Sequence, residues 1–427
     1  MRDVVFVSLE DWDEVWRRNQ FLCAEWLRRF PGMRILFVGR PKDYSRALRR
    51  WEWEPLRRPL LKHSTEFPGL SVLCPRKWAP NSNRVGRWFN ERSLRRQVHW
   101  AMRGLAMRNP ILWINDHFAG HLAGRLDERA VVYDITDDWV QMPSTPAALR
   151  ARIAEADRSL CRRADLVVVC SRALEASRAG GVRRLERVPN AVDAAHYASA
   201  AGARRRFPGK AISASGAEES PVFGYLGTLH GDRLDIPLLE TLARARPGWR
   251  FVLCGPDHLE REERLRLEVL RNLEIRRPVP YAEVPGVLAE FDVCMVPHRC
   301  NAFTESLNPI KLWEYFACGR PIASTPVAGF VDYPQWVHLG GGAQGFERAC
   351  CEALEEPLDA AGERLGVARQ HSWQERVEHL HEIFRQEGWV PPGERGRQES
   401  VRRPAWEEAM GPDDGVEALP QAEGCPG

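Results

Sequence analysis

The sequence predicts an α/β protein that contains two doubly wound units. Short apolar runs alternate with longer amphipathic runs along most of the chain, a pattern typical of parallel sheets covered by helices on both faces. The alternation stops over residues 198–220, where Ala, Ser, Gly and charged residues dominate, and then starts again. Because 427 residues exceed the usual size of one domain, this break indicates a linker between two domains.

The expected elements follow from the apolar periodicity of each unit. In the first unit, strands are expected at Val4–Leu9, Arg34–Gly39, Leu70–Cys74, Ile111–Asn115, Val131–Ile135 and Leu166–Cys170, and helices at Trp16–Phe30, Gly86–Arg108, Ala147–Arg163 and Ser171–Ala179. In the second unit, strands are expected at Val222–Gly227, Arg250–Cys254, Asn272–Arg276, Asp292–Pro297 and Pro321–Thr325, and helices at Leu234–Arg246 and Asn308–Ala317.

These elements define four expected regions of the chain. The first domain covers residues 1–200 and the second covers residues 221–371. A terminal helix is expected over residues 372–387, because Ser372 and Glu375 have the spacing of a capping box. Residues 388–427 are rich in Pro, Gly, Glu and Arg and poor in apolar residues, which predicts disorder.

Composition narrows the class of protein. The net charge of +3 is too small to indicate a nucleic-acid partner. The 11 cysteines stand mostly singly in apolar runs without a CxxC pair, which favours buried free thiols over disulfides or a metal site. No apolar stretch is long enough to span a membrane, and the first residues do not resemble a signal peptide. These features predict a cytoplasmic protein.

The segment 292–330 contains the strongest local signal of a binding site. Asn308 can cap a helix that has Pro309 in its first turn and that follows a predicted parallel strand. Such helix starts bind ligands in open α/β sheets, and their free N–H groups favour phosphate. Lys311 adds a cation, and Glu314 lies one turn further on the same face. On spacing alone, an exposed Lys–Glu pair on a solvated helix is the simpler interpretation.

The residues NPIKLWEYFACGRPI in this segment resemble the donor site of GT-B glycosyltransferases, especially the large retaining group (family 4, or glycosyl transferases group 1) with UDP- or GDP-sugar donors. Further stretches match in the same order, namely DLVVVCSRALEAS, RVPNAVDAAHY and VFGYLGTLHGDRLDIPLLETLARARPGWRFVLCGP. The stretch SWQERVEHL resembles the terminal helix that crosses back over the first domain in this family. The resemblance covers residues 1–386 and is strongest from residue 165 onward.

The resemblance implies two Rossmann-like domains facing each other across a cleft, with the donor held by the second. It implies that Glu314 binds the ribose hydroxyls, that the N–H groups after Asn308 meet the diphosphate, and that Lys311 lies near it. These roles replace the simpler interpretation of an exposed ion pair.

The strand-to-helix turn at the start of the second domain would complete the donor site. The Gly227–Thr228 turn would let the backbone approach the donor closely. Arg233 would supply a second cation, since arginine suits bidentate recognition of phosphate. An ordinary turn at Gly227 and a surface arginine at position 233 are the structural alternatives.

The sequence departs from the family pattern in two places. Many members carry two glutamates eight residues apart, whereas Ser306 stands eight residues before Glu314 and Glu305 stands nine before. The glycine-rich turn that usually follows the first strand is replaced by SLEDWDEVWRRNQ. Contacts to the donor sugar and to the acceptor are therefore left open.

Two first-domain residues are candidates for a role at the reacting centre. Relatives often place a histidine after the strand that ends near Asn115, close to the transferred sugar, which implies His117. Asp138 in YDITDDW could orient or deprotonate an acceptor hydroxyl. A structural histidine and a helix-cap or turn aspartate are the alternatives.

The resemblance implies transfer of a sugar from a nucleotide-sugar donor to a saccharide or lipid-linked acceptor, in the synthesis of cell-surface polysaccharide or glycolipid. Retention of configuration is also implied. Fixed cations and helix N–H groups can stabilise the leaving diphosphate, so no metal and no further cofactor is expected.

Residues 84–108 predict a second kind of contact. This run carries seven arginines interleaved with Trp88, Phe89, Val98 and Trp100. Such a helix can dock on anionic lipid headgroups, which would place the protein at the inner face of a membrane. A core-packed helix with a solvated basic face is the alternative.

Three other functions are compatible with the sequence. A UDP-sugar epimerase can use the same two-domain scaffold. A metal-dependent transferase of the single-domain type would use Asp11 and Asp13 as a DxD site, although so short a match arises easily by chance. A decayed subunit of a polysaccharide assembly complex would explain the altered glutamate pair.

Overall fold

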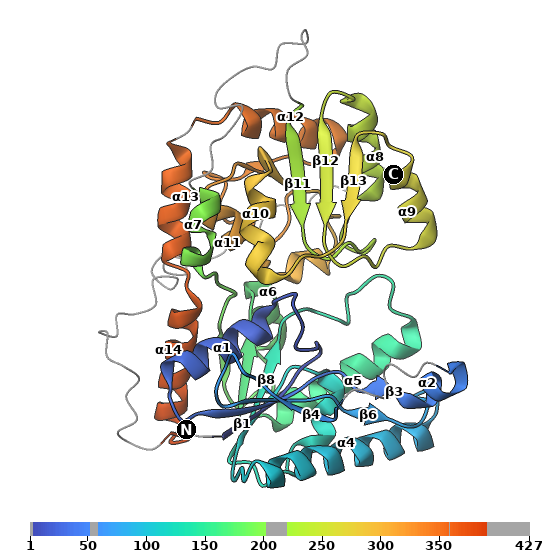
Figure 1. The fold of residues 1–427 in the computed structure, drawn as a ribbon, viewed down its shortest axis with the longest axis vertical. Helices are drawn as coiled ribbons and strands as arrows, with labels where there is room; N and C mark the ends of the chain where they lie inside the picture. Colours follow the sequence, from blue (N-terminus) through green and yellow to red (C-terminus); the bar gives the residue numbers. More distant parts are fainter. Residues whose placement is uncertain (1–2, 52–58, 202–219, 358, 391–427) are drawn as a thin grey trace.

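The computed structural model describes residues 3–51, 59–201, 220–357 and 359–390, which fold into two α/β units (Figure 1). Most of the predicted linker and residues 391–427 of the predicted tail lie outside these ranges. In the described part of the chain, no helix is both long enough and apolar enough to cross a membrane.

The first unit is built on an eight-stranded sheet with the order β10-β9-β8-β7-β1-β2-β5-β4. Its strands are β1 (Asp3–Val7), β2 (Arg34–Val38), β4 (Leu61–His63), β5 (Leu70–Leu73), β7 (Ile111–Ile114), β8 (Ala130–Ile135), β9 (Leu166–Val169) and β10 (Leu185–Arg187). All neighbours are parallel except β4 and β5. A separate short pair joins β3 (Lys42–Asp43) to β6 (Arg76–Lys77).

Helices cover both faces of the first sheet. They are α1 (Arg18–Arg29), α2 (Tyr44–Arg50), α4 (Arg84–Gly104), η1 (His117–Leu122), α5 (Ala147–Arg163) and α6 (Arg172–Arg178). Successive strand residues point to opposite faces. Thus Phe6 and Trp113 pack with α1 on one face, whereas Val7 and Ile114 pack with α4 and α5 on the other.

The second unit contains a six-stranded parallel sheet with the order β13-β12-β11-β14-β15-β16. Its strands are β11 (Val222–Leu226), β12 (Arg250–Cys254), β13 (Leu273–Arg276), β14 (Val293–Val296), β15 (Ile322–Ser324) and β16 (His338–Leu339). Its helices are α8 (Ile236–Ala245), α9 (Arg261–Glu268), η3 (Tyr281–Glu283), α10 (Val284–Ala289), η4 (Thr304–Ser306), α11 (Ile310–Ala317), α12 (Gly342–Glu355) and α13 (Ala360–Arg369). The segment before the linker, η2 (Ala194–Tyr197) and α7 (Ala198–Ala201), packs into the core of this second unit.

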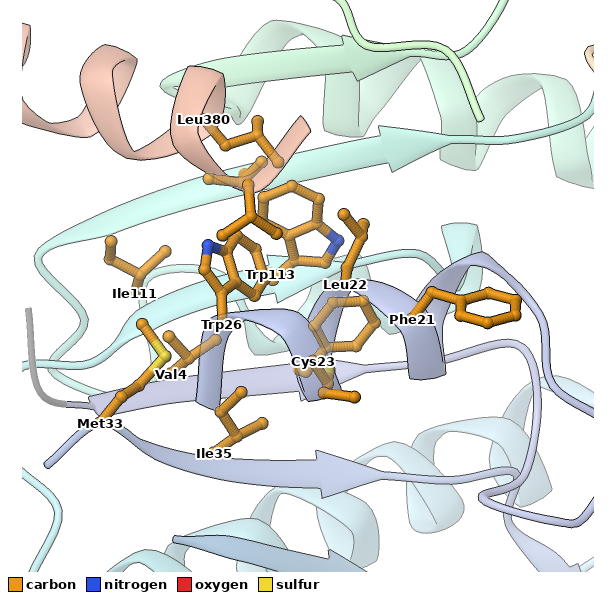
Figure 2. Packing of buried hydrophobic residues seen from close by; sticks show 14 of the residues in the cluster. Val4, Phe21, Leu22, Cys23, Trp26, Met33, Ile35, Ile111, Trp113 and Leu380 are labelled. Atoms are coloured by element: carbon orange, nitrogen blue, oxygen red, sulfur yellow. The ribbon is translucent and has the colours of Figure 1, made fainter. Parts of the chain in front are cut away.

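The last helix, α14 (Trp373–Gln386), returns to the first unit, as predicted. Ser372 is its N-cap and accepts a hydrogen bond from the Glu375 backbone N at 3.2 Å. Figure 2 shows Leu380 of this helix beside Trp26 and Trp113 in the core of the first unit. Burial of the apolar face of α14 therefore stabilises the packing of the last described helix on the first unit.

The two units meet at the carboxyl ends of their strands. Figure 1 shows β11, β12 and β13 directed toward the first unit. From the first unit, residues that follow strand ends reach the second: Asp137 after β8 pairs with Arg233, and Ser171 after β9 donates to the Ser306 carbonyl oxygen at 2.6 Å. This junction is where doubly wound sheets place ligands.

Candidate functional site

The start of α11 differs from the prediction at Asn308. Pro309 occupies the N-cap position and the helix begins at Ile310, so the expected cap by Asn308 is wrong. A residue before proline is pushed toward extended backbone, which moves Asn308 out of the helix. Its side-chain Oδ1 instead accepts a hydrogen bond from the Asn190 backbone N at 2.7 Å.

Asn308 therefore belongs to a polar network that links the two units. The Asn190 side chain also bonds the Asn308 carbonyl oxygen and accepts from Arg18 at 3.1 Å. Arg18, which is 3% exposed, makes two hydrogen bonds to the buried Asp134 carboxylate at 3.1 and 3.2 Å. A charge pair at this depth is stable only because its members are fully hydrogen-bonded. The network fixes the start of α11 relative to the first sheet.

Lys311 lies in the first turn of α11, and its ammonium group contacts Tyr225. Its Nζ donates to the Tyr225 hydroxyl at 2.6 Å and lies 4.0 Å from the centroid of the Tyr225 ring. Burial lowers the pKa of Lys311 to about 7, and the Arg233 charge lowers it too, while Glu314 opposes the shift. An anion beside Lys311 would restore its charge, since an opposite charge favours the ionised form.

Glu314 lies one turn after Lys311, and the two side chains do not form a salt bridge with each other. Instead, Glu314 Oε1 accepts a hydrogen bond from the hydroxyl of the buried Tyr197 at 2.9 Å. Burial raises the pKa of Glu314, while the Tyr197 hydrogen bond and Lys311 act in the opposite direction. The interpretation of an exposed Lys–Glu pair is thus wrong, because each group has its own tyrosine partner.

The turn after β11 approaches Lys311 closely. Gly227 has a φ of 145°, and a Cβ at this position would lie 2.8 Å from Lys311 Nζ. The neighbouring Thr228 accepts a hydrogen bond from the Tyr225 hydroxyl at 3.3 Å through its carbonyl oxygen. Tyr225 also contacts the buried His298 at 3.1 Å. The backbone conformation favours glycine here, and the missing side chain leaves the Lys311 ammonium its present position.

Arg233 reaches the boundary between the units. Its Nη2 lies 3.2 Å from Asp137 Oδ1, and its guanidinium lies 5.2 Å from the centre of the Phe303 ring. Its charge also lowers the pKa of Lys311, which Glu314 raises, so Arg233, Lys311 and Glu314 form one electrostatic group. Asp137 contacts this group from the first unit.

His117 lies in η1, after β7, and its contacts are within the first unit. Its ring packs against Phe118 with centroids 4.4 Å apart. Burial lowers the pKa of His117, and the Asp116 carboxylate opposes this effect. His121, four residues later, contacts the Phe118 carbonyl oxygen at 3.1 Å and lines a surface cavity next to α4.

Asp138 is held by an ion pair inside the first unit. Its Oδ1 lies 3.3 Å from Arg178 Nη2, and Arg178 also donates to Asp157 at 3.0 Å. The Tyr133 hydroxyl completes this group with a 2.7 Å hydrogen bond to Asp157. Of the neighbouring aspartates 137 and 138, it is Asp137 that reaches the second unit.

The loop after β1 contributes Glu10, which the sequence did not single out. Glu10 Oε1 lies 3.4 Å from Arg17 Nε. Burial raises the pKa of Glu10 to about 7, with Arg17 opposing and Asp137 adding to the shift. Asp11 pairs with Lys42 and Asp13 with Arg17, so each carboxylate of the DxD triplet faces a protein cation. The expectation that no metal takes part stays a prediction.

The two residues at and beside the position of the missing glutamate, Ser306 and Glu305, differ in their surroundings. Ser306 is 4% exposed, and its hydroxyl donates to the Phe303 carbonyl oxygen at 2.8 Å. Glu305 is exposed. The Ser306 hydroxyl thus bonds within its own turn, while its carbonyl oxygen accepts a hydrogen bond from Ser171 of the first unit.

The geometry defines a site with a fixed carboxylate, two cations and a close glycine turn at the start of one helix. The carboxylate suits a diol, and the cations with the α11 N–H groups suit a phosphate. Tyr197 and Tyr225, which hold the two charged groups, were not predicted. Their signal was present, since Tyr197 lies in RVPNAVDAAHY and Tyr225 in VFGYLGT, but its meaning depends on tertiary contacts.

Known sequences resemble parts of this chain. Residues 220–356 match the family described as Glycosyl transferases group 1. A Bacillus subtilis (strain 168) protein named "Putative teichuronic acid biosynthesis glycosyltransferase TuaH" is 26% identical over 262 residues. That match covers 57% of this chain and 64% of the Bacillus protein.

Solved structures resemble the chain over nearly its whole length. Sucrose-phosphate synthase from Thermosynechococcus elongatus aligns with a TM-score of 0.66 and 15% identity, covering 92% of this chain and 100% of that one. Anabaena Alr3699/HepE in complex with UDP and glucose aligns with a TM-score of 0.60 and 15% identity, covering 90% and 100%. The prediction of a GT-B fold is confirmed, and the family match falls within the second unit.

Proposed function

We propose that this chain is a glycosyltransferase that moves a sugar from a UDP- or GDP-sugar to a saccharide or lipid-linked acceptor. The observation that carries the proposal is the group at the start of α11, where Lys311 and Glu314 are each held by a tyrosine beside Gly227 and Arg233. The family match over residues 220–356 supports it, because the match includes this group.

In the proposed complex, the Glu314 carboxylate accepts hydrogen bonds from the two ribose hydroxyls of the donor. The diphosphate lies between Lys311, Arg233 and the N–H groups of the first turn of α11. When the sugar leaves, negative charge grows on the diphosphate, and these fixed groups stabilise it. The transfer therefore requires neither a metal nor a proton at the leaving group, and retention of configuration is the outcome that the family resemblance favours.

The acceptor side belongs to the first unit. His117 and Asp138 stay predictions there, as contacts to the transferred sugar and to the acceptor hydroxyl. Glu10 is a further candidate to accept the hydroxyl proton, because its raised pKa near 7 suits a general base at neutral pH. The Bacillus relative supports a role in the synthesis of a cell-surface polysaccharide, and a lipid-linked acceptor would bring the enzyme to a membrane.

A calorimetric titration with UDP, GDP and their glucose or mannose derivatives tests the donor site. At least one nucleotide is expected to bind, and Glu314→Ala is expected to weaken it by about tenfold or more, since two hydrogen bonds to a charged group are lost. Tyr197→Phe, which keeps the carboxylate but removes its hydrogen bond, should give an intermediate loss. Glu305→Ala, at an exposed carboxylate close by, is the matched control.

Three results would contradict this proposal. Full binding by Glu314→Ala would mean that the ribose lies elsewhere. Binding of no nucleotide by the wild-type chain would favour a decayed subunit. Interconversion of a nucleotide sugar without any acceptor, followed by NMR, would indicate an epimerase.

A further inference from the structure

Helix α4 has an outward face that does not suit a purely solvated surface. Val85 is 76% exposed, Trp88 60%, Phe89 45% and Trp100 54%. Single exposed apolar residues are common on proteins, but four on one helix form a patch that marks an interaction surface. The opposite side of the helix, with Val98, packs into the core of the first unit.

Three exposed arginines of α4 lie on the same outward face. The spacing of residues 85, 89, 92, 96, 100 and 103 is that of one helical stripe, and Arg92, Arg96 and Arg103 alternate along it with the apolar residues. Within the described part of the chain, none of the six arginines of α4 forms a salt bridge. Glu91 is the one acidic residue of the helix. The face is therefore both apolar and strongly cationic.

A basic cavity lies against this face. It has a volume of about 280 Å³, and four arginines line it: Arg92 and Arg95 from α4, Arg125 from the loop after η1, and Arg163 from the end of α5. Arg163 already donates to the carbonyl oxygens of Gly120 and Ala123, at 3.0 and 2.7 Å.

The other walls of this cavity include Trp88 and Glu91. The guanidinium of Arg92 lies 5.8 Å from the centre of the Trp88 ring, so the cavity is continuous with the outward face of α4. A site of this charge suits a phosphate, which arginine recognises through paired N–H groups.

The position of α4 leaves the donor site open. Figure 1 shows the helix at the end of the first unit farthest from the second unit, away from α11. A surface bound to α4 would therefore not cover Lys311 or Glu314.

We propose that the outward face of α4 docks on a membrane that contains anionic phospholipid. Arginines of the face bind lipid phosphates, the cavity next to Trp88 receives one headgroup phosphate, and Trp88, Phe89 and Trp100 enter the headgroup region. Charge complementarity favours a membrane as the partner of this face. A cationic surface with interleaved aromatic residues matches an anionic lipid surface better than it matches a second cationic copy of itself. The proposal does not depend on the transfer reaction.

Vesicle flotation of the full chain tests this proposal. Binding to vesicles of phosphatidylcholine mixed with phosphatidylglycerol is expected at low salt, with little binding to phosphatidylcholine alone. Arg92→Gln with Arg95→Gln should weaken binding by roughly tenfold or more, as each cation near the surface contributes to the affinity. Trp88→Ala with Phe89→Ala should weaken it too, and this second loss should persist at high salt, where charge attraction is screened.

The matched control is Arg261→Gln with Leu265→Ala on α9, which removes one exposed arginine and one exposed apolar side chain from the second unit. This variant should float like the wild type. Nucleotide binding by calorimetry should be unchanged in all variants, so a failure of the docking proposal is separable from a failure of the donor site.

Two results would overturn the proposal. Equal flotation of the α4 variants and the wild type would mean that any membrane contact lies elsewhere. The second result is a wild-type chain that does not bind anionic vesicles but self-associates, together with a Trp88→Ala, Phe89→Ala variant that no longer self-associates. It would mean that the face joins two copies of the chain.

Discussion

The two sides of the junction hold their charged groups in different ways. In the second unit, Lys311 and Glu314 lie on one short helix and are fixed by neutral tyrosine hydroxyls. In the first unit, the carboxylates of Asp137 and Asp138 follow a strand end and are held by arginines. A neutral partner leaves the charge of Lys311 available to a ligand, whereas an ion pair neutralises the charge of each carboxylate.

This difference indicates how each side meets its substrate. Under the proposed function, the fixed groups of the second unit need little reorganisation when a charged donor binds. The first unit presents loops whose groups suit neutral hydroxyls. The two sides are joined by the Arg233–Asp137 ion pair, so a donor diphosphate would compete with Asp137 for Arg233.

The largest expected effect comes from removing the available cation. Lys311→Met should lower kcat/KM for sugar transfer by about 10²–10³-fold, as expected when one fixed group that stabilises transition-state charge is lost. The melting temperature should not fall, because a buried charge is costly to the folded state. Steady-state kinetics with any donor identified by titration would measure the effect.

Lys62→Met on β4 is the control, because Lys62 is an exposed lysine of the first unit. Its kinetics should match those of the wild type. If Lys311→Met had wild-type activity, the contrast between the two sides of the junction would lose its main support.

A pH effect of intermediate size is expected on donor affinity. The pKa of Lys311 is about 7 in the free protein, and a bound diphosphate would raise it. Below pH 7 the lysine is charged in both states, so this group adds no pH dependence. Above pH 7 binding takes up a proton, so affinity should fall by up to about tenfold per pH unit until the pKa of the complex is passed.

Calorimetry in buffers of different ionisation enthalpy would measure this proton uptake. Lys311→Met should abolish the slope. Glu10→Gln should keep most of it, because Lys311 is the titrating group beside the proposed diphosphate, although the pKa of Glu10 is also about 7 and the Arg233 charge acts on it too. If the slope were lost in Glu10→Gln and kept in Lys311→Met, the group that takes up the proton would be Glu10 and not Lys311.

The smallest expected effect comes from the ion pair that joins the sides. Asp137→Asn frees Arg233, so donor affinity should rise, by up to about fivefold, the range of a partly exposed ion pair. Asp138→Asn is the matched control, since it breaks a pair inside the first unit and should not strengthen binding. A weaker affinity in Asp137→Asn would mean that Asp137 positions Arg233 instead of competing with the donor.

Much of the fold was predictable because local pattern and tertiary structure agree. Apolar strands, amphipathic helices and the N-cap at Ser372 are properties of neighbouring residues, and most predicted strand ends lie within two residues of the observed ones. The cap at Asn308 failed because a long-range partner, Asn190, competes for its side chain and Pro309 shifts the helix start.

The sequence by itself determined the alternation of elements and the grouping of Lys311 with Glu314, because both depend on spacings of a few residues. Tertiary structure alone decided the partners of these charges. Tyr197 and Glu314 are 117 residues apart in the chain and Tyr225 and Lys311 are 86 apart, yet each pair shares a hydrogen bond. Burial by the folded chain also moved the pKa of Lys311 to about 7, since desolvation is a property of the surroundings and not of the residue.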